Sequence, residues 1–509
     1  MKCLDANVNR EDAILSVPED RVVRSNFGRT GDLDLSTQEA EFEKFMFPMS
    51  QMFDWNEWQK KLITYSMNKG DFDAKWETIR RFHSEVVENF TGYQIPVIAL
   101  HKSTSKEAVC VVFEKVNTGG MPLDAFELIT AMYAAEGHEL RKDWYGGEGN
   151  SGRLHRLIAA NKLGDAESGI LANVASTDFL HVVSLFHTRY LRREAASRGM
   201  LGKELPQVTG NRQALLNLPL SAYKKYEDKV ERGFFTAAKF LHTLHIYRIF
   251  DLPYQSQIIP LAAVLADIGE KWEHEANRAK LVKWYWNGVF GELYGSTTET
   301  RTARDFTELP IWLDGGAEPS TVSETQFRAD RLKTMRMRLS AAYKGVNALL
   351  MMSEARDFRS GQKFDYSVFF GEAVDIHHIF PKEWCKTSGI EPSIYDSIIN
   401  KTPLSYKTNR IIGGVAPSSY LHALENGNET NPPILRSTLD GYLRSHLADP
   451  ELLRSNDFYA FVDDRQAKLV ALIETATGKK VLTGDIRADD EEYEEDEDAA
   501  EAMQTTGTP

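Results

Sequence analysis

The spacing of apolar residues changes twice along the chain, and it predicts three stretches of different structure. The first stretch ends near Trp144. It contains two short β-branched runs, residues 97–100 and 109–113, which predict strands, and a helical pattern at residues 125–135. A glycine-rich break at residues 146–152 is a natural boundary before the second stretch.

The second stretch, residues 154–350, has apolar residues at intervals of three and four, which predict an almost wholly helical region. The clearest patterns occur in four segments: residues 234–250, 256–268, 276–290 and 325–350. The polar segment 297–304 has threonine and arginine side chains that suit phosphate contacts, but we expect an ordinary surface loop there.

The third stretch, residues 364–480, has a strand–loop–strand–helix pattern. Residues 366–370 and 373–380 are strand-like in composition, and a proline-containing loop separates them from a second strand near residues 402–405. A helix is expected to begin near Tyr406, because Ser405 is a good N-cap, and to stop at Gly413. The pattern therefore predicts a ββα unit within an α+β chain.

Composition places few limits on this organisation. No run reaches the ~18 consecutive apolar residues that a membrane helix requires, and the first residues lack the layout of a signal peptide. We therefore expect a cytoplasmic protein without membrane contact. The three cysteines, Cys3, Cys110 and Cys385, are scattered and odd in number, so they predict neither a disulfide framework nor a zinc site.

The formal net charge of −14 is concentrated near the C-terminus. Residues 485–501 contain eleven acidic residues and one basic residue, so this segment accounts for −10 and the remaining residues for −4. Residues 481–509 therefore predict an acidic, disordered, solubilising tail. The alternative is a tail that competes with DNA for a basic groove, because the nearly balanced remainder can still hold such a groove.

Two short segments carry the residues best suited to catalysis. The first is Asp-Ile-His-His-Ile-Phe-Pro at residues 375–381, and the second is residues 400–410, with two asparagines nine residues apart. Hydrolysis of a phosphodiester requires activated water and compensation of the charge that develops on the phosphate and the leaving oxygen. A histidine of near-neutral pKa can activate the water, and a divalent cation with nitrogen and oxygen ligands can compensate the charge.

These segments resemble the HNH, or ββα-metal, nuclease motif. In that motif a strand ends in an acidic residue or histidine, followed by a second histidine, an apolar residue and a nearby proline. The resemblance implies that His378 is the general base and that His377 and Asn409 hold the metal. It also implies that Asn400 ties the two segments together. Two cations that flank Asn409 are expected to contact DNA phosphates: Lys407 and Arg410.

The metal-ligand position departs from the usual pattern of the family, which has Asp or Glu where this chain has His377. An imidazole ligand shifts a site toward softer metals, and we expect Mg²⁺ or Mn²⁺. Asp375 lies two residues earlier, on the same face of a regular strand. It is either a further metal ligand or a partner that orients an imidazole. Regular alternation separates His377 from His378, so the motif requires the strand to end or twist before Pro381.

A second signature lies in the first stretch. Residues 113–120, Phe-Glu-Lys-Val-Asn-Thr-Gly-Gly, and the helix that follows are similar to the N-terminal half of GmrSD-type proteins. These are modification-dependent restriction enzymes that join a ParB-like, nucleotide-hydrolysing domain to an HNH domain. The resemblance implies four parts: a partial ParB-like domain (residues 1–145), a helical linking domain (146–350), an HNH nuclease domain (351–480) and the acidic tail (481–509).

Asn117, Thr118, Gly119 and Gly120 are the candidate nucleotide-binding residues. The glycines permit positive φ and a nest of N–H groups around a phosphate, although glycine pairs are also common in plain turns. In the family an Asp-Gly-Gln-Gln-Arg segment upstream also serves the nucleotide, and none precedes Phe113. We therefore do not expect this chain alone to hydrolyse NTP. The open explanations are a misplaced or truncated start, a partner chain that supplies the segment, and a remnant domain with a structural or DNA-sensing role.

The sequence thus predicts a metal-dependent endonuclease that hydrolyses DNA, and the resemblance implies restriction of foreign or base-modified DNA in phage defence. One alternative is a non-catalytic or regulatory DNA-binding subunit that needs a partner chain with the missing nucleotide motif. Another is an RNA nuclease, which would use the same site chemistry. Double-strand cleavage requires two cuts, which is compatible with a homodimer, but no residue pattern demonstrates one.

Overall fold

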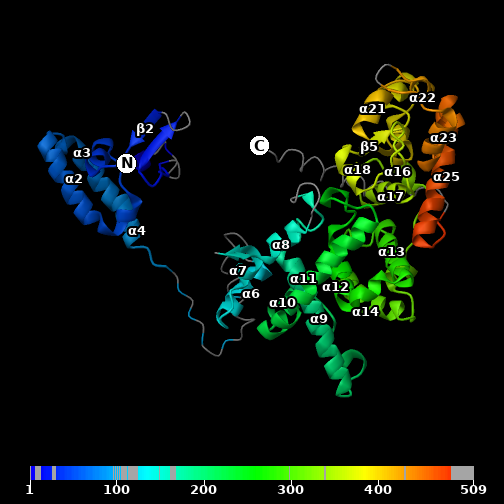
Figure 1. Cartoon of the computed structure of the whole chain (residues 1–509). Helices are drawn as coiled ribbons and strands as arrows, with labels where there is room; N and C mark the ends of the chain where they lie inside the picture. Colours follow the sequence, from blue (N-terminus) through cyan, green and yellow to red (C-terminus); the bar gives the residue numbers. More distant parts are fainter. Residues whose placement is uncertain are drawn as a thin grey trace. The chain divides into compact units, whose positions relative to one another are not determined.

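The structure, a computed structural model, describes residues 2–5, 8, 13–25, 30–95, 97, 99, 101, 104, 112, 124–147, 149–160, 168–296, 298–337, 340–428 and 431–482. The chain divides into two units, Met1–Thr104 and Ser105–Pro509 (Figure 1). Both combine helices with small antiparallel strand pairs, so the chain is of the α+β class and mostly helical. Within the described residues, no helix is both long and apolar enough to cross a membrane.

The first unit is a helical bundle with one strand pair. Its elements are β1 (Val22–Ser25), β2 (Thr30–Asp34), α1 (Gln38–Lys44), α2 (Trp55–Lys69), α3 (Phe72–Phe82) and α4 (Glu88–Thr91). An aromatic core that includes Trp55 and Trp58 holds the helices together. The buried Glu41 accepts a hydrogen bond from Nε1 of Trp58 at 2.9 Å and pairs with Arg21, so this core also contains a satisfied charge.

The second unit begins with a long series of helices. In chain order its first elements are α6 (Ala125–Ala134), α7 (Leu140–Tyr145), the hairpin β3 (Gly146–Gly147) and β4 (Asn150–Ser151), α8 (Arg153–Ala159), α9 (Ser176–Ser197), α10 (Arg212–Leu216), α11 (Leu220–Thr243), α12 (Ile258–Ile268), α13 (Glu275–Phe290), α14 (Thr298–Leu313), α15 (Ser320–Ser323), α16 (Arg331–Thr334) and α17 (Ala341–Met352).

The remaining elements surround the strand pair β5–β6, in the yellow to red part of Figure 1. They are α18 (Tyr366–Gly371), β5 (Asp375–His378), α19 (Lys382–Thr387), α20 (Pro392–Tyr395), β6 (Lys401–Leu404), α21 (Tyr406–Ile412), α22 (Pro417–Asn426), α23 (Arg436–Ser445), α24 (Pro450–Arg454) and α25 (Phe458–Thr477). One hydrophobic core extends from Ala125 to Ile473, and α17 packs against α13, α25 and β6. The strand pair therefore lies against the helical body.

Several sequence predictions of local structure are confirmed. The expected helix at residues 125–135 is α6, and α12 and α13 match their predicted segments within two residues. The strand pair and the helix that follows it also lie where they were predicted, as β5, β6 and α21. The strands expected at residues 97–100 and 109–113 fall largely outside the described residues, and Asn117, Thr118, Gly119 and Gly120 fall wholly outside them. The domain boundaries inferred from the resemblance stay predictions.

Four local predictions were wrong in whole or in part. The helical pattern at residues 234–250 ends early, because α11 stops at Thr243. Residues 366–370 form the helix α18 rather than a strand, because the Asp365 side chain accepts a hydrogen bond from the Val368 amide and caps the turn. Residues 298–304, which belong to a segment expected as a loop, begin α14, whose Thr302 is fully buried. The segment 325–350 is not one helix, since α16 ends at Thr334 and Ser340 caps a new helix, α17.

Candidate functional site

The antiparallel pair β5–β6 positions the two candidate histidines at one end of a hairpin. His377 lies opposite Thr402 and His378 opposite Lys401 in the last two registers of the pair. β5 ends at His378, so the backbone departs from regular strand geometry directly after this residue. The requirement that the strand end before Pro381 is therefore met.

Asn400 fixes the backbone immediately after His378. Its buried side chain accepts a hydrogen bond from the Phe380 amide at 2.8 Å and donates to the carbonyl oxygens of Phe380 and Tyr395, both at 3.0 Å. The Asn400 carbonyl oxygen also accepts from the Ile379 amide at 2.8 Å. Asn400 thus joins both ends of the long loop between the two strands and restrains the position of His378.

Arg465, on α25, supports the same end of the loop through hydrogen bonds to the backbone. It is fully buried and donates to the carbonyl oxygens of His446 at 3.1 Å and Lys401 at 2.9 Å, and also to that of Ile399. Burial of the guanidinium lowers the pKa of Arg465 to about 9. Because Ile399 directly precedes β6 and Lys401 begins it, these hydrogen bonds let α25 hold the segment that carries Asn400.

His378 has an orienting carboxylate that the sequence did not reveal. Its Nε2 lies 2.8 Å from Oδ1 of Asp396, in the loop between the strands. A carboxylate only accepts hydrogen bonds, so Nε2 carries the proton and donates, which leaves the lone pair of a neutral imidazole on Nδ1. Burial lowers the pKa of His378 despite the opposing effect of Asp396. The ring is therefore neutral near pH 7 and able to accept a proton through Nδ1.

Two lysines lie near the Asp396 carboxylate. The Nζ atoms of Lys382 and Lys401 are each 4.0 Å from an oxygen of the Asp396 carboxylate. Asp396 is partly buried, so these cations are less screened than they would be at a fully exposed position. No local motif marked Asp396 because it is separated from His378 by eighteen residues and lies between short helices.

The helix α21 carries Asn409 in its second turn, and two side chains fix its start. The Ser405 hydroxyl accepts a hydrogen bond from the Thr408 amide at 3.2 Å, and the helix ends at Gly413 with a φ of 54°. The nearly fully buried Asp357 accepts from the Ser405 amide at 3.0 Å and from the Thr408 hydroxyl at 2.6 Å. Asp357, which lies in the loop after α17, therefore acts as a second cap for α21 and connects that loop to the start of the helix.

The candidate metal ligands come from different elements of this unit. His377 lies near the end of β5, Asn409 lies on α21, and Asp375 begins β5 on the face shared with His377. In the described part of the chain, no group of three or more His, Cys, Asp or Glu side chains is arranged to hold a metal ion. A cation held by His377 and Asn409 would therefore have few protein ligands and several open positions, as Mg²⁺ usually has.

The two candidate phosphate contacts are exposed on α21. The Nζ of Lys407 lies 3.0 Å from Oε2 of Glu372, and the Arg410 guanidinium lies over the Tyr406 ring, 5.7 Å from its centre. Exposed ion pairs of this kind contribute little stability and exchange readily with other anions. Lys407 is therefore able to leave Glu372 for a phosphate.

Comparison with known proteins gives one distant relative. No family model matches the chain. It is 26% identical over 371 residues to the uncharacterized protein MJ0686 of Methanocaldococcus jannaschii. The match covers 70% of this chain and 58% of that protein, so the chain spans little more than half the length of the relative. This similarity shows that the two sequences are related, and it assigns no activity to this chain.

Proposed function

We propose that the chain is a metal-dependent HNH-type endonuclease that hydrolyses DNA phosphodiester bonds. The observation that carries the proposal is the hydrogen bond between His378 and Asp396 at the end of β5, which leaves Nδ1 of a neutral imidazole as a base. The order β5, β6, α21 supports it, because that hairpin and helix present the residues expected of a ββα-metal site on adjoining elements.

The chain's own residues account for the proton transfer and for the binding of the substrate. Nδ1 of His378 takes a proton from water, whose oxygen then forms a bond to phosphorus as the bond to the leaving oxygen breaks. Asp396 stabilises the resulting imidazolium through Nε2. His377 and Asn409, with Asp375 as a further candidate, would hold Mg²⁺ or Mn²⁺. The cation, when bound, supplies charge stabilisation to the phosphate and the leaving oxygen.

The resemblance to GmrSD-type enzymes supports a biological role in restriction of foreign DNA, including base-modified DNA. In that role Lys407 and Arg410 contact the DNA backbone. Hydrolysis of NTP is not part of the proposal, since the candidate residues from Asn117 to Gly120 lie outside the described part of the chain. A partner chain or a second copy of this chain is compatible with the proposal.

Cleavage of plasmid DNA is expected to depend strictly on a divalent cation. Purified full-length protein with Mg²⁺ or Mn²⁺ should convert supercoiled plasmid to nicked or linear forms, and excess EDTA should stop the reaction because the phosphate charge is then uncompensated. Unmodified DNA, base-modified DNA and RNA are compared, each with and without NTP. Cleavage of RNA alone would assign an RNA nuclease. A folded protein that cuts none of these substrates would favour the regulatory subunit.

Replacement of Asp396 by asparagine is expected to lower kcat by about 10- to 100-fold, the usual effect of losing an orienting partner, with little change in KM. The amide no longer fixes the proton on Nε2 or stabilises an imidazolium. The measurement is steady-state cleavage of a fluorescent duplex, with the exposed Asp463→Asn as matched control. Partial recovery in Asp396→Glu is expected. A rise in KM of about 10- to 100-fold with unchanged kcat would show that Asp396 acts on DNA binding instead.

A further inference from the structure

Residues 328–336 form a basic strip on the second unit. Its four cations are, in chain order, Arg328, Arg331, Lys333 and Arg336. The first two are already paired, because their Nη2 atoms lie 2.6 and 2.9 Å from carboxylate oxygens of Asp330 and Glu292, respectively. Lys333 and Arg336 are exposed, and no carboxylate among the described residues pairs with either of them. The basic strip therefore has two cations left for a further anion.

The far end of the basic strip borders the candidate site. The carbonyl oxygen of Arg336 accepts a hydrogen bond from Nζ of Lys401 at 3.3 Å. The same Nζ lies 4.0 Å from the carboxylate of Asp396, which orients His378. The helix α16, within the basic strip, also packs against α20 and against the turn Ile398–Asn400 that precedes β6. An anion on this strip therefore lies next to the loop that holds the candidate base.

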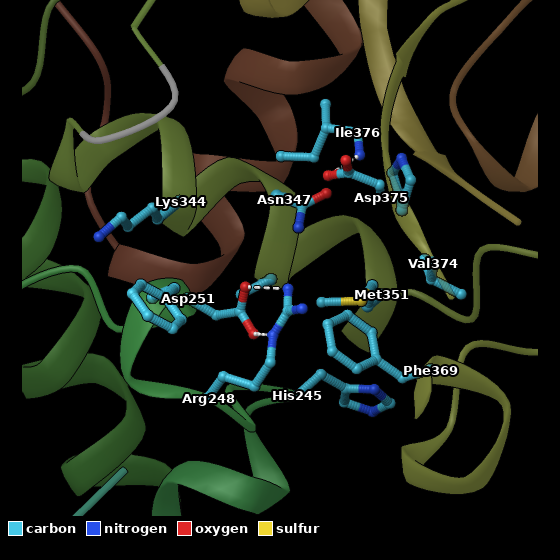
Figure 2. A pocket seen from close by; sticks show the side chains of 13 residues that line it. His245, Arg248, Asp251, Lys344, Asn347, Met351, Phe369, Val374, Asp375 and Ile376 are labelled. Carbon is cyan, nitrogen blue, oxygen red and sulfur yellow. Dashed lines mark hydrogen bonds and ion pairs between the residues drawn. The ribbon is translucent and has the colours of Figure 1, made fainter. Parts of the chain in front are cut away.

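The cations of the cavity beside β5 differ from the basic strip, because they are already engaged. Arg248 donates two hydrogen bonds of 2.8 Å to the carboxylate of Asp251, as the dashed lines in Figure 2 show. Nζ of Lys344 donates to the Leu252 carbonyl oxygen at 3.1 Å, and burial lowers the pKa of this lysine. The cavity holds only about 260 Å³. It is therefore unsuited to a chain of carboxylates, whereas the exposed basic strip fits one.

The last described residue, Leu482, is paired with the start of the basic strip. Its amide donates a hydrogen bond to the Phe327 carbonyl oxygen at 2.8 Å, and its own carbonyl oxygen accepts one from the Ala329 amide at 2.9 Å. The pairing of Leu482 with Arg328 is parallel, so the chain at Leu482 runs in the same direction as the start of the strip. Both the position and the direction of the chain at Leu482 therefore lead toward α16.

The acidic segment, residues 485–501, begins three residues after Leu482. It contains eleven acidic residues and one basic residue, so its charge is −10. Residues 482–489 span at most about 25 Å when fully extended. The basic strip includes the helical turn of α16, which rises only about 1.5 Å per residue, so the strip is shorter than an extended chain of its length. The acidic residues from Asp489 onward can therefore reach both exposed cations.

We propose that the acidic segment docks on the basic strip of its own chain and pairs with Lys333 and Arg336. Complementary charge, the short reach and the direction of the chain at Leu482 all favour this occupant over a second chain. The docked segment competes with DNA at the border of the candidate site, in addition to keeping the chain soluble. Only this competition rests on the proposed nuclease function; the contact between the segment and the strip does not.

Carbodiimide cross-linking of the full chain tests the contact, because this reagent joins a lysine amine to a carboxylate that lies against it. Mass spectrometry is expected to find Lys333 joined to the acidic segment, and the exposed Lys239 on α11 not joined to it. Arg336→Gln should lower the yield at Lys333 by about two- to fivefold, the effect of losing one exposed ion pair. The matched change of an exposed arginine on α11, Arg232→Gln, should not.

A mixture of isotopically labelled and unlabelled protein distinguishes contact within one chain from contact between two. Cross-links confined to one isotopic form support the proposal. Cross-links between the two forms would assign the segment to a second copy and overturn it. The absence of any link at Lys333, or a yield that Arg336→Gln leaves unchanged, would show that the basic strip does not attract the segment.

The competition is measured by the anisotropy of a fluorescent DNA duplex in EDTA. Replacing the nine acidic residues between 489 and 498 by their amides (Asp→Asn, Glu→Gln) should tighten DNA binding about tenfold at low salt, because non-specific affinity is largely electrostatic. In a background of Lys333→Gln and Arg336→Gln, this gain should fall to about twofold. In the matched background of Lys239→Gln and Arg232→Gln, it should persist.

The two parts of the proposal fail separately. No gain in DNA affinity, or an equal gain in both backgrounds, would overturn the competition with DNA. The cross-links decide the contact independently of that result. A chain that cleaves no DNA would remove the proposed nuclease function and leave the cross-linking result unaffected.

Discussion

His378→Ala is expected to lower the rate of metal-dependent DNA cleavage by roughly 10²- to 10⁴-fold, the contribution typical of a positioned general base. The alanine removes Nδ1, the proton acceptor, but leaves the Asn400 hydrogen bonds that fix the loop. Folding and DNA binding should therefore change little. The measurement is the single-turnover cleavage rate, with circular dichroism and DNA-binding anisotropy alongside.

The matched control for this variant is His422→Ala, since His422 is an exposed histidine on α22 in the same unit. It should cleave at the wild-type rate. Full activity in His378→Ala would remove His378 from the mechanism, whatever the control showed. Loss of activity in both variants would indicate general sensitivity of the fold and would leave the role of His378 without support.

Asp357→Ala is expected to destabilise the chain by about 3 kcal/mol, because it leaves several donors without an acceptor in a buried place. These donors include the Ser405 amide and the Thr408 hydroxyl at the start of α21. Cleavage should fall as well, since α21 carries Asn409. Urea unfolding at pH 7 measures the effect, and the exposed Asp463→Ala should lie within about 0.5 kcal/mol of wild type.

The destabilisation caused by Asp357→Ala is expected to depend on pH. Burial raises the pKa of Asp357, but hydrogen bonds from Ser360, Thr408 and Ser405 outweigh it, so the pKa lies below the ordinary value of 3.8. A carboxylate with a depressed pKa contributes stability above its unfolded pKa and loses it as the pH falls through its folded pKa. The difference between wild type and Asp357→Ala should therefore be constant near neutrality and shrink below pH 3.8. A constant difference down to pH 2 would contradict this account.

The ββα unit was predictable because its signals are local. Ser405 caps a helix that starts at the next residue and Gly413 ends it, while the strand at residues 375–378 is bounded by Pro381. Residues 366–370 were not predictable in the same way, since a short apolar run suits a helix or a strand equally and only the Asp365 cap decided between them.

The residues that orient the candidate site were missed because tertiary packing, rather than spacing, brings them there. Asp396 lies eighteen residues from His378, and Asp357 lies forty-eight residues from Ser405. A single aspartate in a loop has no periodicity or motif that assigns it a partner. Arg465 likewise has the sequence context of an ordinary amphipathic helix, yet it is fully buried and donates to the backbone at the start of β6.

The dependence of the hairpin on Arg465 also sets an order of events during protein synthesis. Residues 375–412 leave the ribosome well before α25, which begins at Phe458. Until Arg465 emerges, the carbonyl groups of Ile399 and Lys401 lack their donor, and the loop that restrains His378 is incomplete. A growing chain thus contains every candidate catalytic residue before it can hold them in position. For the proposed DNA nuclease, this sequence of events postpones activity until α25 has been synthesised.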